Sequence, residues 1–188
     1  MANKTTVALS LEQFKEIIDL MRVGGSGFRP NNRIATALVL EANLGLRIED
    51  IIRLRLCDIV KDGANYRLDI EEHKTKKKRT FIVPIAVYQF IYMYCEENEI
   101  GKNDIMFPIT TRAVQKHLKT VADYLGYDNI GTHSFRKFYA SDVYEKNNYD
   151  IELVRDLLQH SSTATTQRYI KRSSVKLEEA IQKHVYIV

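Results

Sequence analysis

The chain has 188 residues and a formal net charge of +4, with 45% hydrophobic and 28% charged residues. This length and balance are typical of one globular domain with a core of its own. Its two cysteines have neither paired spacing nor a nearby histidine cluster, which excludes a disulfide framework and a zinc site and favours a reducing cytoplasm. The absence of an apolar signal core and of a bilayer-length apolar run argues against secretion and membrane insertion.

The first part of the sequence predicts two helices. Ser10 and Gln13 have capping-box spacing, in which each side chain satisfies an exposed backbone N–H. Apolar residues follow at helical spacing, at Leu11, Phe14, Ile18 and Met21. The glycine-rich stretch 24–27 ends this helix, and Pro30 suits the first turn of the next one. One face of the second helix carries Ala35, Leu38, Val39 and Ala42. Gly45 suits a left-handed position at its C-terminus.

Arg47 stands between this second helix and a third, short helix. The apolar residues of the third helix are Ile48, Ile51, Ile52 and Leu56. A charged residue flanked by apolar residues at a helix junction is expected to point inward or into a cleft. Asp50 is three residues further on and could hold the guanidinium by a charge-assisted hydrogen bond. Taken alone, Arg47 therefore indicates a structural salt bridge, with catalysis as the rarer alternative.

The middle of the chain predicts a small antiparallel sheet. Residues 62–63 form an Asp-Gly turn signal, and apolar residues then alternate with polar ones at Tyr66, Leu68 and Ile70. Residues 81–83 form a return strand that ends at Pro84, and a short strand around Ile59 would be the third. The turn between the last two strands is strongly basic, with Lys74, Lys76, Lys77, Lys78 and Arg79. Such a run favours a polyanion, although a solvated hairpin tip is the alternative.

Helical spacing returns after Ile85. One helix has an apolar face with Val87, Phe90, Ile91 and Tyr94, and another has one with Val114, Leu118, Val121 and Leu125. Gly101 and Gly126 end these two helices. Three basic residues of the second helix could contact DNA phosphates or bases, or form an exposed stripe: Arg112, Lys116 and Lys119. Helices around one small sheet predict an α+β, mainly α domain.

The segment 132–169 contains the densest group of reactive side chains. Thr132 suits a helix N-cap, and His133 and Arg136 then share one face, where their N–H donors suit a phosphate. The aromatic residues expected on the opposite face are Phe135, Phe138 and Tyr139. The next helix buries Ile151, Val154, Leu157 and Leu158, and it ends at His160. Tyr169 follows. Taken singly, such a histidine is usually a helix cap and such a tyrosine usually belongs to the core or surface.

In combination, the ordered residues resemble the catalytic signature of the tyrosine recombinases, the family of phage and transposon integrases and Xer-type resolvases. The matching residues are Arg47, Lys74, His133, Arg136, His160 and Tyr169, in the strings GLRIEDII, the basic hairpin, HSFR, LLQHSS and RYI. The resemblance extends over residues 11–169. Phe135 replaces the family's usual leucine, and Lys76 is the alternative to Lys74. The resemblance implies the tyrosine recombinase catalytic-domain fold with a small three-stranded antiparallel sheet.

The resemblance also implies a site-specific recombinase that cleaves and rejoins DNA through a 3′-phosphotyrosyl intermediate. Tyr169 would attack the phosphate, the two arginines would neutralise it, and Lys74 would protonate the departing 5′-oxygen. The two histidines would hydrogen-bond the phosphate, and His133 would also accept the tyrosine proton. No metal or cofactor is implied. The glycines of residues 24–27 lack a following Gly-Lys-Ser/Thr, so ATP dependence is not expected either.

Family members usually have a separate N-terminal DNA-binding domain, for which this sequence has almost no room. We therefore expect residues 1–188 to form a single catalytic domain, with a core at 10–172 and a C-terminal helix and tail at 173–188. The helix would cover Val175 to Lys183. By the resemblance, the apolar end 185–188 would be exchanged between subunits of a tetramer on double-stranded DNA, assembled from a monomer or weak oligomer. The host would be a prokaryotic cell, and the gene that of a phage or mobile element.

Three alternatives use part of the same features. The first is a DNA-binding regulator on the same fold without recombinase activity. The second is a type IB topoisomerase, which relaxes supercoiled DNA with a similar set of Tyr, Arg and His. The third is a helix-turn-helix regulator, in which short helices would meet around residues 147–150; it leaves the ordered Arg, His and Tyr without a role.

Overall fold

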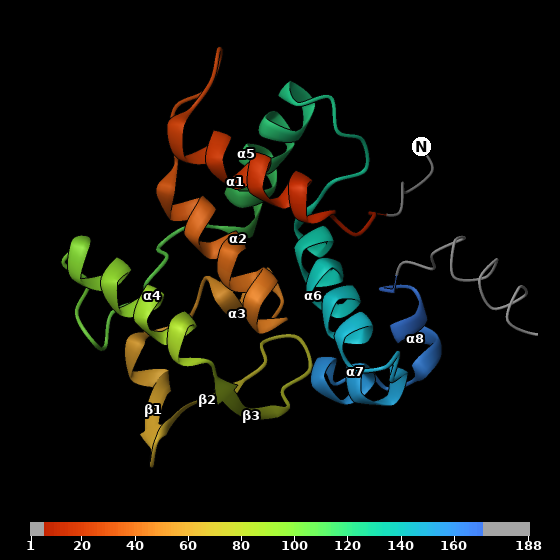
Figure 1. Cartoon of the computed structure of the whole chain (residues 1–188). Helices are drawn as coiled ribbons and strands as arrows, with labels where there is room; N and C mark the ends of the chain where they lie inside the picture. The colour runs from red at the N-terminus through yellow and green to blue at the C-terminus, as the bar shows by residue number, and fades with distance from the viewer. Residues whose placement is uncertain (1–5, 171–188) are drawn as a thin grey trace, which may run out of the picture.

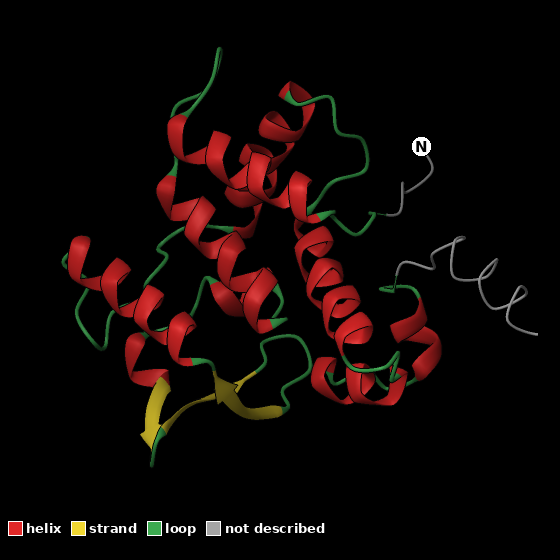
Figure 2. Cartoon of the chain, in the orientation of Figure 1, coloured by secondary structure: helices red, strands yellow, loops and turns green. Residues whose placement is uncertain are grey.

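The computed structural model describes residues 6–170, and the predicted C-terminal helix and apolar end lie outside this range (Figure 1). Its α-helices are α1 (Leu11–Val23), α2 (Asn32–Leu44), α3 (Ile48–Ile51), α4 (Ile85–Glu97), α5 (Thr111–Tyr124), α6 (Thr132–Lys146), α7 (Ile151–Leu158) and α8 (Thr163–Gln167). A 3₁₀ helix, η1 (Leu56–Asp58), precedes the strands β1 (Ile59–Asp62), β2 (Asn65–Glu71) and β3 (Lys78–Val83). Helices dominate around one small sheet (Figure 2), which confirms the α+β, mainly α class.

The sheet is antiparallel in the order β1-β2-β3, as the alternating pattern predicted. Leu68 of β2 pairs with Ile59 on one side and with Phe81 on the other, and its side chain is fully buried. The sheet lies at one end of the molecule beside α4, and Tyr66 of β2 stacks on Tyr88 of α4 with ring centroids 3.6 Å apart. The hairpin that joins β2 to β3 is thereby fixed to the helical part of the molecule.

The main core lies among the first helices and the start of α6. Helix α6 runs alongside α2, and its Phe135 is fully buried against Phe14 of α1, 6.0 Å away between ring centroids. A second, smaller cluster lies at the other end of α6, where α7 and α8 pack against it. Its fully buried residues are Ala140, Val154 and Leu158, with Tyr139, Val143, Tyr144 and Tyr169 around them. The helices therefore form one large packed region and one small one.

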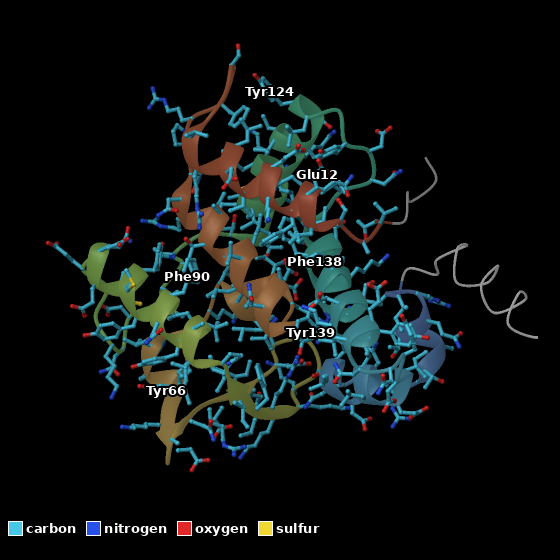
Figure 3. The ribbon with its side chains drawn as sticks, viewed as in Figure 1. Glu12, Tyr66, Phe90, Tyr124, Phe138 and Tyr139 are labelled. Carbon is cyan, nitrogen blue, oxygen red and sulfur yellow. The ribbon has the colours of Figure 1, made fainter. Side chains whose placement is uncertain are left out.

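Gly45 follows α2 at a position that disfavours any residue with a side chain. It caps α2 in the left-handed conformation with φ +60°, as predicted. A Cβ at this position would lie 2.5 Å from ring atoms of Tyr139, which points from α6 toward the end of α2 in Figure 3. Glycine thus allows both the turn and the close approach of α6.

Several local predictions were correct and others need correction. The reciprocal hydrogen bonds of the Ser10–Gln13 capping box are present. Pro30 lies outside α2, because Asn31 is the N-cap and accepts the Ile34 N–H. The third helix ends at Ile51, since the chain then enters η1. Leu11 is 56% exposed at the first position of α1, whose buried residues are Ile17, Ile18 and Met21.

Helix α6 begins at Thr132, so the prediction that Thr132 is its N-cap is wrong. Gly131 occupies the N-cap, and its N–H donates to the Ser134 hydroxyl. In α7, Val154 and Leu158 are fully buried, whereas Ile151 and Leu157 are only partly buried. Among residues 6–170, no helix is both long and apolar enough to cross a membrane.

Candidate active site

Arg136 is a fully buried charged group in the region where the predicted site residues meet. Its side chain is fully buried, and it donates through Nη1 to the Gly45 carbonyl at 2.6 Å and through Nη2 to the Leu158 carbonyl at 2.8 Å. Burial, and then the nearby positive charges of Arg47 and Arg79, lower its pKa to about 10. Arg136 stays charged at neutral pH and ties α6 to the C-terminal ends of α2 and α7.

The Nε atom of Arg136 is also buried and has no hydrogen-bond partner among the described residues. A buried donor of this kind is costly to leave unpaired. Arg136 therefore retains one N–H donor that no described residue uses.

Arg47 lies at the same place but is partly accessible, with 17% of its side chain exposed. Its Nη1 donates to Glu72 Oε2 at 2.6 Å, so the prediction that Asp50 holds this guanidinium is wrong. Arg47 precedes α3 with extended backbone, so it is not placed on the helix surface one turn before Asp50. Asp50 instead accepts the backbone N–H of His73 at 2.8 Å. Both carboxylates therefore act near Arg47, but only Glu72 hydrogen-bonds it.

Arg79 is a buried structural residue, which contradicts its prediction as an exposed DNA contact. It donates to Glu72 Oε1 at 3.2 Å and to the Leu157 carbonyl at 2.6 Å, and its guanidinium lies 4.7 Å from the Phe81 ring centroid. Alternate residues of a strand share one face. In β3 the inward face includes Arg79 and Val83, so the end of the basic run turns into the protein.

The basic turn between β2 and β3 presents its lysines to solvent. The exposed members are Lys74, Lys76, Lys77 and Lys78, and the last already belongs to β3. The turn closes through hydrogen bonds from the Glu72 N–H to the Lys77 carbonyl and from the Lys76 N–H to the Glu72 carbonyl, at 3.0 and 2.9 Å. Lys76 has a left-handed φ of 56°. Lys74 therefore lies on a turn that is closed by its own backbone hydrogen bonds.

His160 lies just past α7, whose C-cap Gln159 is in the left-handed conformation. Its Nδ1 is 3.1 Å from the Thr166 hydroxyl of α8. Burial and then the charges of Arg136 and Arg47 lower its pKa to about 4. His133 is exposed at the start of α6, and its pKa is lowered by partial desolvation and then by the same two arginines. Both imidazoles are therefore neutral at physiological pH.

Tyr169 lies directly beside His160, with ring centroids 4.7 Å apart. Its backbone N–H donates to the Thr166 carbonyl at 2.8 Å, and its carbonyl accepts the Ser141 hydroxyl at 3.3 Å. The Lys137 amine lies 5.7 Å from its ring centroid. The phenol ring is half-buried on the small cluster at the end of α6.

Three residues near the site were missed by the sequence reasoning. Glu72 was hidden beside the basic run, and Lys137, which is buried and donates to the Thr6 carbonyl, carried no distinguishing signal. Glu41 is fully buried on α2, and burial raises its pKa well above the ordinary value. A lone glutamate within an apolar helical run was the signal that could have found Glu41.

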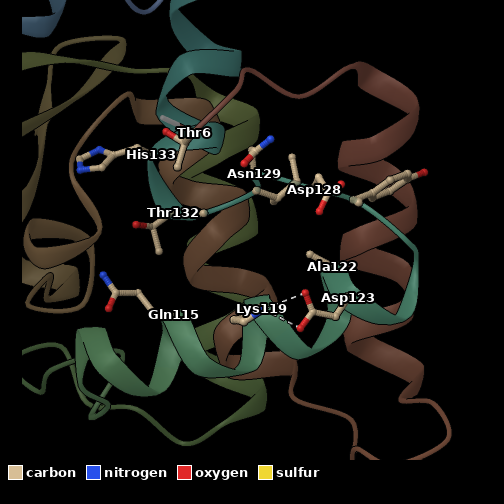
Figure 4. Close-up of a pocket in the computed structure, with 12 residues that line it drawn as sticks. Thr6, Gln115, Lys119, Ala122, Asp123, Asp128, Asn129, Thr132 and His133 are labelled. Atoms are coloured by element: carbon tan, nitrogen blue, oxygen red, sulfur yellow. Dashed lines mark hydrogen bonds and ion pairs between the residues drawn. The ribbon is translucent and has the colours of Figure 1, made fainter. Parts of the chain in front are cut away.

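The basic residues of α5 are Arg112, Lys116 and Lys119, and Lys119 shares a cavity with His133. All three are exposed, and Lys119 pairs with Asp123 at 2.7 Å. Lys119 lines a cavity of about 430 Å³ between α5 and the start of α6, with Asp123 and Asp128 in its wall (Figure 4). These carboxylates disfavour an anion inside the cavity, although His133 of the candidate site also lines it. Within residues 6–170, no cluster of three or more His, Cys, Asp or Glu side chains is arranged to hold a metal ion.

A model of the phage integrase family matches residues 8–175 of this chain. A probable integrase/recombinase, YoeC of Bacillus subtilis, is 30% identical over 168 residues, which cover 86% of either chain. The tyrosine recombinase XerH of Helicobacter pylori is 24% identical over 180 residues, which cover 90% of this chain but 49% of XerH. This chain thus spans most of YoeC and about half the length of XerH.

Solved structures show the same fold. The XerH recombinase bound to its palindromic difH substrate, after cleavage, superposes with a TM-score of 0.73 at 20% identity, over 97% of this chain and 54% of that one. The catalytic domain of bacteriophage HP1 integrase superposes with a TM-score of 0.64 at 17% identity, over 95% of both chains. The second match shows that this chain has a catalytic-domain fold over most of its length.

Proposed function

Because the chain belongs to the phage integrase family and has the tyrosine recombinase catalytic-domain fold, we propose that it is a site-specific DNA recombinase. It would cleave and rejoin DNA strands through a 3′-phosphotyrosyl intermediate. The observation that carries this proposal is the position of Tyr169 against His160, in a group that also contains the buried guanidinium of Arg136. XerH, a relative of the same fold, has been solved with difH DNA before and after cleavage, which supports DNA as the partner.

The two arginines would bind and activate the scissile phosphate. Each guanidinium can donate to nonbridging oxygens and neutralise the charge that develops in the transition state. Arg136 has a buried Nε donor without a partner among the described residues, and Arg47 is partly accessible. Together they form a preorganised site for a phosphodiester without requiring side chains to be drawn from solvent.

Tyr169 would be the nucleophile. A phenol with an ordinary pKa of about 10 must lose its proton as it attacks phosphorus. The Tyr169 oxygen forms the new P–O bond, the bond from phosphorus to the 5′-oxygen breaks, and the phenol proton passes to a neutral imidazole. We assign this acceptor role to His133, which is exposed and can pass the proton on to solvent, and the orienting role to His160, whose ring contacts Tyr169.

Lys74 would complete the reaction by protonating the departing 5′-oxygen. General acid catalysis of this kind is worth roughly 10²–10⁴-fold in rate. Lys74 is exposed on a turn that is closed by its own backbone hydrogen bonds. Its amine can therefore enter a DNA groove while the backbone of the turn stays in place. Lys76, Lys77 and Lys78 would contact the DNA backbone beside it, as would Arg112, Lys116 and Lys119 on α5.

The proposed recombinase would assemble into a tetramer on DNA. We propose that residues 1–188 act as one catalytic domain, with its core at 10–172, and that the segment 173–188 passes to a neighbouring subunit in a tetramer. Deleting residues 181–188 should then abolish cooperative DNA binding and strand exchange while leaving single-site cleavage. Unchanged cooperativity in the shortened chain would rule out tail exchange.

Covalent capture tests the proposed chemistry without knowledge of the target. The protein is incubated with a pool of nicked duplexes of randomised central sequence, and DNA that remains attached after denaturation is sequenced. The expected result is an enriched sequence that is captured by the wild type and not by Tyr169→Phe. Capture by Tyr169→Phe would refute the assigned nucleophile.

The same capture experiment, together with plasmid relaxation, separates the recombinase from the alternative functions. A regulator on this fold would bind duplexes without any covalent capture. A type IB topoisomerase would relax supercoiled plasmid with no sequence preference and would enrich no sequence from the pool. Capture of one enriched sequence, followed by strand transfer to a 5′-hydroxyl end of the same sequence, is the outcome expected for a recombinase.

A further inference from the structure

Glu72 is a carboxylate with an unusual environment. It follows β2 directly, its side chain is fully buried, and both of its oxygens are engaged. Oε2 accepts from Arg47 Nη1 at 2.6 Å and from the Thr75 hydroxyl at 2.8 Å, and Oε1 accepts from Arg79 Nη1 at 3.2 Å. One buried anion therefore lies between two guanidiniums.

This environment keeps Glu72 ionised. Burial alone would raise its pKa, but the Thr75 hydrogen bond and the Arg47 guanidinium outweigh burial, and the pKa lies below the ordinary value. The negative charge also separates two like charges, since Arg47 and Arg79 would otherwise repel each other across a poorly solvated space. Neutralising Glu72 therefore changes the position of Arg47 as well as the local charge.

The bond to Glu72 defines how Arg47 faces the site. A guanidinium is a rigid planar group with five N–H donors in a fixed arrangement. The bond from Nη1 to a buried acceptor restricts the orientation of this group, and the side chain stays 17% exposed, so other N–H donors remain for a ligand. Asp50 does not hold Arg47 in this structure: its Oδ1 accepts the His73 N–H, and its buried Oδ2 has no hydrogen-bond partner among the described residues.

Glu72 also organises two other parts of the site. Its backbone and side chain close the turn that carries Lys74, through hydrogen bonds with Thr75, Lys76 and Lys77. Through Arg79, which donates to the Leu157 carbonyl at 2.6 Å, it reaches the end of α7 immediately before His160. Arg47, Lys74 and His160 come from separate elements. Glu72 bonds Arg47 directly, the Lys74 turn through Thr75, and the end of α7 before His160 through Arg79.

We propose that Glu72 is a positioning residue for DNA cleavage: its buried carboxylate orients Arg47 toward the scissile phosphate and anchors the Lys74 turn. Glu72 itself does not touch the DNA. This inference rests on the proposed recombinase function, because it assigns Arg47 and Lys74 their roles in that reaction.

The test measures cleavage and binding separately in Glu72→Gln, on the duplex enriched by covalent capture. Glu72→Gln keeps the side-chain size and removes the charge. We expect the rate constant for adduct formation at saturating DNA to fall roughly 10- to 100-fold, the size of one charge-assisted hydrogen bond. The dissociation constant for DNA, measured in the Tyr169→Phe background, should change by less than about threefold, because many backbone contacts share the affinity.

Two control variants remove trivial explanations. Arg67→Gln breaks the exposed Asp62–Arg67 ion pair of the same sheet and should leave adduct formation unchanged. Val114→Ala opens a cavity in the core-facing side of α5 and reports what loss of stability alone does to cleavage. If Glu72→Gln folds poorly, Glu72→Asp is used instead; it keeps the charge but is one methylene shorter, and a smaller loss confined to the rate constant is expected.

The outcomes are distinguishable. A selective loss of rate in the Glu72 variants, absent in both controls, supports the positioning role. Adduct formation by Glu72→Gln at the rate of Arg67→Gln, or a loss matched by Val114→Ala at equal stability, overturns that role while leaving the recombinase function intact. Absence of any wild-type adduct on the pool overturns the proposed function, and the inference about Glu72 with it.

Discussion

The arginine side and the tyrosine side of the candidate site are held in different ways. Arg136 is fully buried and is bonded to the ends of two helices, α2 and α7, and Arg47 is held by a buried carboxylate. Tyr169 is half-buried on a cluster with only three fully buried apolar residues in the described part of the chain. The phosphate-binding side is thus preorganised, whereas the nucleophile depends on weaker local packing.

This difference has a chemical consequence. Electrostatic stabilisation of a transition state is most effective when the donors need no reorganisation. A nucleophile, in contrast, must approach the phosphate and later leave room for a new strand, so an element of low local stability suits it. Perturbing the arginine side should therefore slow an otherwise intact site, and perturbing the tyrosine side should change how often the nucleophile is in place.

Arg136→Lys should have the largest effect. Lysine keeps the charge but cannot bond the Gly45 and Leu158 carbonyls with one planar group, and it leaves buried carbonyls unpaired. We expect the adduct rate constant to fall about 10²–10³-fold. The free energy of unfolding in urea should fall by about 3 kcal/mol. A lysine variant with near wild-type cleavage would show that the arginine side is not rigidly preorganised.

Leu158→Ala tests the tyrosine side against Leu118→Ala in the main core. Both leucines are fully buried, and each truncation should cost about 2–4 kcal/mol of unfolding free energy. Because Leu158 supports the small cluster under Tyr169, its truncation should also populate a locally opened α7–α8. Opening displaces Tyr169 and also releases the Leu158 carbonyl from Arg136, so adduct formation should slow by roughly tenfold more than in Leu118→Ala. Hydrogen exchange of residues 163–167 should rise only in Leu158→Ala. Equal slowing in both variants would contradict a separate weak region.

Gly45→Ala, compared with Gly63→Ala, measures how closely α6 is fitted to the arginine side. Both glycines have left-handed φ angles, +60° and +59°, so either alanine costs about 1 kcal/mol of backbone strain. At Gly45 the new Cβ also meets the Tyr139 ring at 2.5 Å, whereas at Gly63 nothing lies within 4 Å. Thermal and urea unfolding should show a loss about 1–3 kcal/mol larger at Gly45. Equal losses would mean that Tyr139 moves freely away.

Sequence patterns predicted the parts of this molecule that depend on neighbouring residues. The Ser10 capping box, the left-handed Gly45 and the alternation around Leu68 each follow from local rules, and each is present. The family signature predicted the fold because its spacing spans several elements at once. The resemblance, for example, implied that the elements carrying Arg47 and Arg136 meet at one phosphate.

What the sequence could not predict depends on tertiary packing. Glu72 lies 25 residues from Arg47, and only the folded position of the β2–β3 turn makes them partners instead of Arg47 and Asp50. The misassignment of Arg79 was avoidable, since period-two alternation carried back from Val83 through Phe81 places it on the inward face. Lys137 lies near Tyr169 only in the folded chain, and no sequence pattern relates these two residues.

His160 joins the two sides, and its titration gives the smallest of these effects. Its pKa is about 4 in the folded chain against an ordinary 6.5, because burial and the arginine charges disfavour the imidazolium. Between these values the unfolded chain binds more protons, so stability falls as pH decreases from about 6.5 towards 4. Allowing for solvent screening, we expect His160 to contribute on the order of 1–2 kcal/mol of this loss.

His160→Asn, which can still reach the Thr166 hydroxyl, should lose correspondingly less stability than the wild type between pH of about 7 and about 5 in urea unfolding. The same loss in both proteins would show that burial and the arginine charges do not hold His160 neutral in the folded chain.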